Sequence, residues 1–377
     1  MKRLKSIDTF RGICMAWMII GHILDWWLQT AFYGVYLFFL NAFDFIGAAS
    51  FIFVSGLSIA YTMKRKRGME SFNEKKTRNE YLLKAGYVFI LAIIYNLAIA
   101  IAINDYTMIW TWFVLLTISV SLLLGWPLLK TPKTFRIFLG IVIWILNQFL
   151  FHWTLVMQES SQFAAILHYI FYNTSDLDPI LSFFPFFLFG TVVGEVVFEI
   201  NSTDNNYYSR FLMKNKLIYP SLVIGPALII TGVLYRFPNF FSRGSFSWMI
   251  YSMGMILLIF SALLGLEIYE KIKTKRSYRI FYYYSYYSLT VFLLHNVIYF
   301  LFFEALNIIF IWFSIVITFF SIGLILRIIH NRFGAYASIK SQLGRLASGT
   351  AKIIENLIEN ENSLIELIQR KLRIESY

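Results

Sequence analysis

The stretch RGICMAWMIIGH, from Arg11 to His22, decides the class of fold. Its ten inner residues carry no formal charge, and the predominantly apolar run around it extends from Ile7 to Leu28. A helix needs about 20 such residues to cross the hydrocarbon core of a bilayer. The stretch therefore predicts a membrane-spanning helix that carries two ionisable side chains, an arginine and a histidine.

The composition extends this prediction to the whole chain. Of the 377 residues, 58% are hydrophobic and 14% are charged, whereas soluble domains carry about 25% charged residues. We therefore predict an all-α, polytopic membrane protein with about ten transmembrane helices. The predicted spans are Ile7–Leu28, Leu40–Met63, Tyr81–Ile103, Met108–Leu129, Phe135–Trp153, Pro179–Ile200, Leu217–Tyr235, Phe246–Ile268, Phe281–Phe303 and Leu306–Ile329.

Basic and acidic residues alternate between the loops. Lysine and arginine gather at the N-terminus and in every second loop, whereas the other loops carry mainly acidic residues, with Arg236 and Arg243 as exceptions. Because cytoplasmic loops are enriched in lysine and arginine, we expect both termini in the cytoplasm and the chain in the plasma membrane. The same bias accounts for the formal net charge of +12 without a nucleic-acid partner.

The chain divides into a transmembrane domain, residues 1–330, and a polar tail, residues 331–377. The tail sequence AKIIENLIENENSLIELIQRKLRI repeats apolar pairs at helical spacing, which predicts a short amphipathic cytoplasmic helix. This helix could lie on the inner membrane surface or pair with another helix. The sequence leaves both settings open. Separately, the protein could be a homo-oligomer.

Arg11 and His22 lie on one face of the first predicted helix. Eleven residues return a helix to within about 20° of its starting direction, at about 16 Å along the axis. Arg11 then lies at the cytoplasmic edge and His22 in the outer part of the bilayer. Ionisable residues inside a span are costly and point to function. The structural alternatives are a polar helix–helix bond for His22 and an anchoring role for Arg11.

The two depths suggest group transfer from a phosphate-rich carrier. Arg11 could hold the phosphates at the inner edge, and a long arm could deliver its end to His22. A neutral imidazole can act as a general base, and a carboxylate on its second nitrogen would fix the tautomer. Asp25, one turn after His22, and Asp44, at a comparable depth on the second helix, are the two candidates for that carboxylate.

Four motifs resemble signatures of the transmembrane acyltransferase superfamily. RGICMAWMIIGH has the arginine, ten residues and histidine of its acyltransferase 3 branch, and SFIFVSGLSIAYTMKRKRG is similar to the second-helix signature. FFPFFLFGTVVG, whose Gly190 and Gly194 would permit close helix packing, and SLTVFLLHNVIYF resemble the middle and late helices. The pattern RLKSIDTFRG…SGLSI is most similar to the heparan-α-glucosaminide N-acetyltransferase-like family. The resemblance covers most of residues 1–330.

This resemblance implies transfer of an acetyl or short acyl group from cytoplasmic acetyl-CoA, or another acyl-CoA, to an extracytoplasmic sugar, glycan or glycolipid. His295 stands at the histidine of the late-helix motif, where it would orient the acceptor, shuttle a proton or only join two helices. Lys275, Arg276 and Arg279 could join Arg11 around the nucleotide phosphates, although the positive-inside rule explains them equally well. No metal-ligand spacing is present, so we expect no metal.

Two questions stay open at this point. The second-helix region lacks a histidine that the lysosomal member of the resembling family has. The acceptor group could therefore be an amine or a hydroxyl. A polytopic transporter or flippase for a small anionic or glycan solute also fits, with Arg11 as a counter-charge and His22 as a proton relay. An acyltransferase needs a carrier pocket open to the cytoplasm, whereas a transporter needs alternating access.

Overall fold

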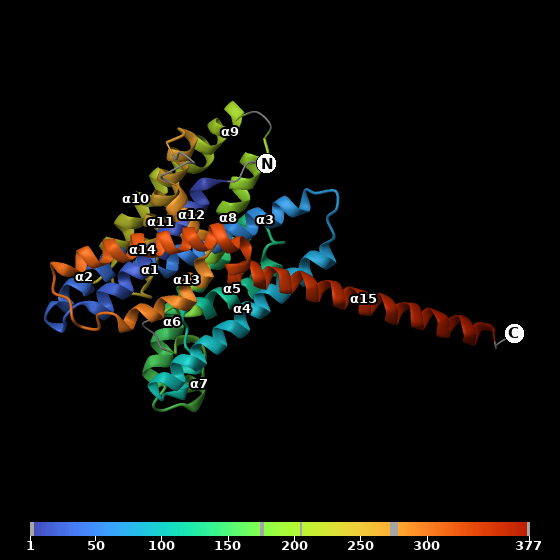
Figure 1. Cartoon of the computed structure of the whole chain (residues 1–377), viewed down its shortest axis with the longest axis horizontal. Helices are drawn as coiled ribbons and strands as arrows, with labels where there is room; N and C mark the ends of the chain where they lie inside the picture. Colours follow the sequence, from blue (N-terminus) through green and yellow to red (C-terminus); the bar gives the residue numbers. More distant parts are fainter. Residues whose placement is uncertain (1–3, 174–176, 204–205, 272–277, 375–377) are drawn as a thin grey trace.

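The computed structural model describes residues 4–173, 177–203, 206–271 and 278–374. Within these ranges the chain is mostly helical, with turns and loops between the helices, and its β-structure is one isolated bridge between Leu28 and Leu306. The described residues contain nine helical stretches that are long and apolar enough to cross a membrane. The prediction of an all-α polytopic membrane protein is therefore confirmed. The helices pack into one bundle, from which the C-terminal helix projects (Figure 1).

The helices follow the predicted spans with shifted ends. The long ones are α1 (Lys5–Trp27), α3 (Ala48–Arg67), α4 (Glu74–Ile103), α5 (Val114–Leu128), α6 (Lys133–Met157), α8 (Ile180–Asn201), α10 (Tyr219–Tyr235), α11 (Phe246–Ile268) and α14 (Phe310–Phe333). Shorter helices stand between them. These are α2 (Tyr33–Phe43), α7 (Gln162–Tyr172), α9 (Asn206–Met213), α12 (Arg279–Tyr286) and α13 (Ser288–Leu294).

Two of the predicted spans are interrupted helices. The span predicted at Leu40–Met63 starts in α2, breaks at the short segment η2 (Asp44–Ile46) and resumes as α3. The span predicted at Phe281–Phe303 consists of α12, α13 and the 3₁₀ segment η5 (His295–Phe300). A hydropathy pattern averages over such breaks, so the sequence predicted two straight helices. The segments η2 and η5 begin at Asp44 and His295, two residues that the sequence analysis had selected for function.

The centre of the bundle is the pair formed by α3 and α8. Helix α8 is buried along most of its length. The two backbones approach closely where glycines stand on α8, because a Cβ on Gly190 would overlap the carbonyl oxygen of Phe53 and one on Gly194 that of Leu57. These two glycines therefore permit close helix packing, as the sequence predicted.

The outside of the bundle is apolar. Phe138, Phe149 and Leu234 are 65%, 71% and 72% exposed. Large apolar side chains exposed to this extent, over helices of spanning length, are suited to contact with lipid chains rather than water. The bilayer is therefore the surrounding medium of this surface.

The predicted tail helix is present as α15 (Ile339–Ile374). Its first half packs along α4, where the hydroxyl oxygens of Tyr87 and Thr350 lie 2.8 Å apart. The rest of α15 extends away from the bundle (Figure 1). Its two predicted settings, the membrane surface and a second helix, both stay predictions.

We expect Gly190→Ala to destabilise the protein, because the added methyl group must displace the backbone of α3. Overpacking of this kind costs about 1–3 kcal/mol, so the apparent melting temperature in detergent should fall by several degrees. Gly265→Ala in α11 is the matched control, since nothing lies within 4 Å of a Cβ there and alanine is the better helix former. Equal melting temperatures for the two variants would contradict a tight α3–α8 contact.

Candidate active site

His22 and His295 lie side by side, with their ring centroids 4.7 Å apart. His22 belongs to α1, and His295 begins η5. Trp26, one turn after His22, stacks on His22 at a centroid distance of 4.6 Å and on His295 at 5.7 Å. We refer to these three residues as the histidine cluster. The structure thus joins two histidines that the sequence analysis considered separately.

The end of α1 holds η5 in place. The indole Nε1 of Trp27 donates a hydrogen bond to the carbonyl oxygen of Ile298 at 2.8 Å. The backbone N–H of Leu306 donates to the carbonyl oxygen of Trp27, also at 2.8 Å. This second bond satisfies one of the carbonyl groups left open at the C-terminus of a helix. Together these bonds fix the segment that carries His295 against the end of α1.

The hydrogen bond of His295 determines which of its nitrogens is basic. Its Nδ1 is bonded to the carbonyl oxygen of Phe292. Because a carbonyl oxygen only accepts, Nδ1 donates, and Nε2 is the basic nitrogen of the neutral ring. His22 is half-buried, and its ring makes no hydrogen bond to the part of the chain that the structure describes. Each ring therefore has a nitrogen that could accept a proton from a substrate.

The two candidate carboxylates have partners other than His22. Asp25 is hydrogen-bonded to the hydroxyl group of Tyr36, and Oδ1 of Asp44 lies 3.3 Å from Nη1 of Arg243. Over the described ranges, no hydrogen bond or ion pair joins His22 to either aspartate. The support of His22 by Asp25 or Asp44 therefore stays a prediction.

Arg243 links Asp44 to a third residue, Asp178. Its Nη2 lies 2.5 Å from Oδ1 of Asp178, and we refer to the three residues as the outer ion cluster. The other carboxylate oxygen of Asp44, Oδ2, is buried and has no hydrogen-bond partner among the described residues. The sequence analysis noted Arg243 only as a basic exception among acidic loops. That exception was the available signal for this cluster.

Burial raises the pKa of Asp178 to about 6, a shift that Arg243 opposes and Asp44 increases. Burial alone would lower the pKa of Arg243, but Asp44 and Asp178 outweigh it and raise that pKa above its ordinary value. The arginine therefore stays charged throughout the physiological range. The Asp178 carboxyl group, in contrast, changes its charge just below neutral pH.

At the other end of α1, Arg11 contacts serines from two other helices. Its Nη2 donates to Oγ of Ser58 in α3, and its Nη1 donates to Oγ of Ser285 in α12 at 3.4 Å. Gly12 allows α12 to come this near, because a Cβ there would overlap the carbonyl oxygen of Phe281. The FRG and SGLS motifs, which lie on different helices, are thus in contact through Arg11 and Ser58.

Other cations gather around Arg11. Lys84 of α4 interacts electrostatically with Arg11 and with Lys66, and Nζ of Lys340 donates to a backbone carbonyl of α12 at 3.3 Å. We refer to these four residues as the basic cluster. Asp8 offsets part of its charge and accepts hydrogen bonds from two hydroxyl groups of residues 278–285, at 2.7 and 3.3 Å.

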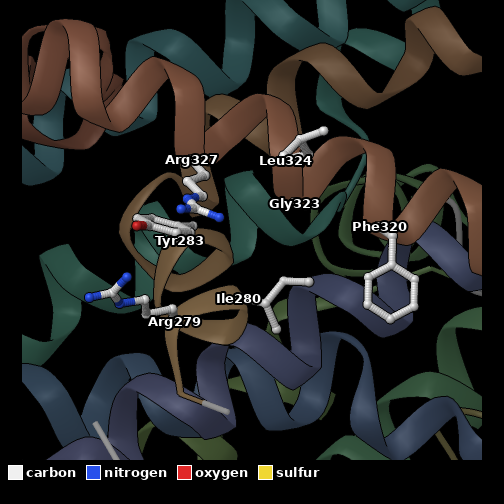
Figure 2. Close-up of a pocket in the computed structure, with 7 residues that line it drawn as sticks. All are labelled: Arg279, Ile280, Tyr283, Phe320, Gly323, Leu324 and Arg327. Atoms are coloured by element: carbon white, nitrogen blue, oxygen red, sulfur yellow. The ribbon is translucent and has the colours of Figure 1, made fainter. Parts of the chain in front are cut away.

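Of the remaining predicted phosphate ligands, the structure describes Arg279. Lys275 and Arg276 lie outside the described residues. Arg279 is the first residue of α12 and lines a groove between α12 and α14 (Figure 2). Over the described ranges, no hydrogen bond or ion pair joins Arg279 to Arg11.

Helix α1 connects the basic cluster to the histidine cluster. It runs without interruption from Lys5 to Trp27, so Arg11 and His22 are separated by about 16 Å along its axis. In the described part of the chain, no group of three or more His, Cys, Asp and Glu side chains could hold a metal ion. The site is thus built from an arginine, imidazoles and carboxylates.

Comparison with known protein families gives the relationship. A sequence model described as heparan-alpha-glucosaminide N-acetyltransferase, catalytic, matches residues 3–235. The chain belongs to this family. The match includes Arg11, His22 and both candidate aspartates, and it ends before His295. Comparisons with curated proteins and with solved structures gave no significant match. In general terms, therefore, the chain is a membrane protein of an N-acetyltransferase family.

The outer ion cluster should give protein stability a pH dependence. Folding raises the pKa of Asp178 from an ordinary 3.8 to about 6, so the folded state binds this proton more tightly than the unfolded state does. The contribution of Asp178 to stability is therefore expected to fall as the pH rises from about 4 to 6. Melting temperatures of the native protein and of Asp178→Asn should be measured across this range. The melting temperature of the native protein, relative to that of the variant, should fall as the pH rises from about 4 to 6.

Asp105→Asn is the comparison variant for this experiment, because Asp105 is an exposed carboxylate. It removes one negative charge without touching the outer ion cluster. A constant difference between the native protein and Asp178→Asn from pH 4 to pH 7 would contradict the assignment of a proton to Asp178 near pH 6.

Proposed function

We propose that the protein transfers an acetyl or short acyl group from acyl-CoA, held at the basic cluster, to an amine or hydroxyl group of a sugar, glycan or glycolipid. His22 acts as the general base. The observation that carries this proposal is that one uninterrupted helix, α1, bears both Arg11 and His22. A cationic recognition site and a proton acceptor then lie on one rigid element, at different depths in the bilayer.

The proposed orientation puts the basic cluster on the cytoplasmic side of the plasma membrane. Helix α3 ends at this side with the run Lys64–Arg67, and α14 has His330 and Arg332 in its last turn. Concentration of lysine and arginine at one end of a bundle is typical of the cytoplasmic end. Acyl-CoA from the cytoplasm would reach the basic cluster first, and the acceptor would arrive from the opposite side.

Phosphate groups suit the chemistry of the basic cluster. A guanidinium such as that of Arg11 forms charge-assisted hydrogen bonds with phosphate oxygens, and lysines add positive charge around it. The serines that contact Arg11 hold its side chain in position. The pantetheine arm would then extend along α1 and bring the thioester carbonyl to the histidine cluster.

The proposed reaction conserves atoms and charge. His22 accepts the proton of the acceptor amine or hydroxyl as the acceptor atom attacks the thioester carbonyl carbon. The carbon–sulfur bond then breaks, and the departing thiolate receives the proton from the His22 imidazolium. The products are the acylated acceptor and CoA with a free thiol. His295, in contact with His22, positions the ring.

The polar groups of the outer ion cluster could bind the acceptor molecule. Asp44 has a buried carboxylate oxygen with no hydrogen-bond partner among the described residues, and a sugar hydroxyl or ammonium group could donate to it. Tyr36 extends the polar surface from Asp25 towards Arg243, with which it interacts electrostatically. The choice between an amine and a hydroxyl acceptor is left to experiment.

Incubation of the purified protein with labelled acetyl-CoA tests the proposal as a whole. Label should pass to a membrane glycolipid extract, and CoA should be released in equal amount. Uptake of a glycan or anion into proteoliposomes, with no transfer of label, would instead favour the transporter alternative. No transfer to any acceptor fraction would remove the acyltransferase assignment.

We expect His22→Ala to lose transfer while it keeps its fold and its affinity for CoA. Removal of a general base typically lowers the rate by 10²–10⁴-fold, and the phosphates would bind about 16 Å away along α1. Turnover of labelled acetyl-CoA and a calorimetric CoA titration measure the two effects separately. His152→Ala is the matched control, because His152 is exposed on α6 and lies outside the histidine cluster.

His295→Ala distinguishes the roles of the two imidazoles. As a positioning residue, His295 should give a smaller loss of turnover when it is replaced, and the loss should be partly restored in His295→Gln. Near-native transfer in His22→Ala, with transfer abolished in His295→Ala, would move the base from α1 to η5.

We expect Arg11→Gln to weaken CoA binding while the protein keeps its fold. Loss of one hydrogen bond to a charged group costs about 1.5–3 kcal/mol, equivalent to about 10–150-fold in the dissociation constant. Arg65→Gln is the matched control, because Arg65 is an exposed residue near the same end of α3. A calorimetric affinity that is equal in the two variants would exclude Arg11 from the donor site.

A further inference from the structure

A groove on the outside of the bundle lies between α12 and α14. Its volume is about 370 Å³, and Arg279, Tyr283 and Arg327 line its polar part. Ile280, Phe320 and Leu324 line the apolar part. Figure 2 shows the two arginines and Tyr283 on one side of the groove and Phe320 on the other. The groove is therefore polar at one end and apolar along the rest.

The two arginines lie at the same end of the groove because the helices run in opposite directions. Arg279 begins α12, whereas Arg327 stands in the last two turns of α14. Phe320 precedes Arg327 by seven residues, which is about 10 Å along the helix. The charges therefore lie near one membrane edge, and the apolar part extends from there towards the middle of the bilayer.

Neither guanidinium of the groove is neutralised by a carboxylate among the described residues. In the described part of the chain, Arg279 and Arg327 form no ion pair with a carboxylate. Two positive charges that line one groove repel each other, and an anion between them removes the repulsion while it accepts hydrogen bonds from both. A phosphate group is the anion that arginine forks bind well.

The surroundings of the groove indicate a lipid rather than a soluble phosphate. Phe320 and Leu324 are 59% and 57% exposed on the outside of a membrane-spanning helix, where they face hydrocarbon. The donor site proposed above lies on another face of α12, where Ser285 is buried against Arg11. The groove thus offers two cations for a headgroup, an apolar surface for an acyl chain, and access from the bilayer.

We propose that the α12–α14 groove binds one anionic phospholipid from the leaflet at the basic end of the bundle. Arg279 and Arg327 hold its phosphate, and one acyl chain lies along Ile280, Phe320 and Leu324. Basic pockets between transmembrane helices are suited to anionic headgroups in this way. This proposal depends on the membrane-spanning fold and does not require acyl transfer.

Native mass spectrometry of the full chain in detergent tests the proposal. The protein is titrated with phosphatidylglycerol and, separately, with phosphatidylcholine of the same chains. We expect one tightly held phosphatidylglycerol and at least tenfold weaker retention of phosphatidylcholine. The double variant Arg279→Gln/Arg327→Gln should lose this preference. Arg332→Gln/Arg345→Gln removes the same charge from exposed residues near the same end of the bundle and should keep it.

Competition separates the possible sources of phosphate. Glycerol phosphate, inorganic phosphate and CoA should each fail to displace the bound lipid, because they lack the acyl chain that fills the apolar part. Displacement by CoA, or equal retention of both lipids, would overturn the proposal, as would equal losses in the two double variants. Arg327→Gln alone, at an exposed position on α14, keeps the test decisive if the double variant fails to fold. It should weaken phosphatidylglycerol retention at least threefold, and no change would count against the site.

Discussion

Backbone N–H and C=O groups that lie within a bilayer have no water to bond with, and this constraint governs the whole structure. Each unpaired group costs several kcal/mol in hydrocarbon, so lipid-facing segments must be helical. An interrupted helix is tolerated only where other parts of the protein surround it. The segments η2 and η5 begin at Asp44 and His295, which are 6% and 5% exposed. Each segment thus starts at a buried polar residue, whereas Val297 and Phe300, later in η5, are 66% and 81% exposed.

The rigidity of α1 complements these breaks. An unbroken helix keeps Arg11 and His22 at a fixed separation, whereas the interrupted helices bring partners to each end of it. At its N-terminal end, Gly12 lets α12 come close enough for Ser285 to contact Arg11. At its C-terminal end, hydrogen bonds between Trp27 and the segment around η5 hold His295 beside His22. Local features of one helix therefore organise both clusters.

The sequence alone predicted the features of this arrangement that depend on periodicity along the chain. Hydropathy located the spans, and the helical repeat put Arg11 and His22 on one face, because both signals come from residues close together in the chain. The close packing at Gly190 and Gly194 followed from their spacing of four residues. The contact between His22 and His295 could not be predicted in this way, since it depends on how distant helices pack.

The outer ion cluster is a second arrangement that the sequence could not predict. Arg243 stood out as a basic residue among acidic loops, but nothing local connected it to Asp44 or Asp178. Those links exist because η2 and the residues before α8 reach the same place at one end of the bundle. Asp44 was identified from sequence by its depth, and its partners could be found only from the packing. Depth in the membrane is encoded locally, whereas pairing is a property of the fold.

Helix α12 is the element on which the separate parts of the structure converge. One face of α12 contacts Arg11 through Ser285, and Gly12 of α1 allows the two helices to come this close. Another face of α12 lines the groove with Arg279. Because α12 has only two turns and continues through α13 into η5, a shift of α12 would move Ser285 and His295 together. A headgroup held between Arg279 and Arg327 would join α12 to the long helix α14 and resist such a shift. The protein already holds α12 against α1 and α14, and a lipid in the groove would add a further contact on its outer face.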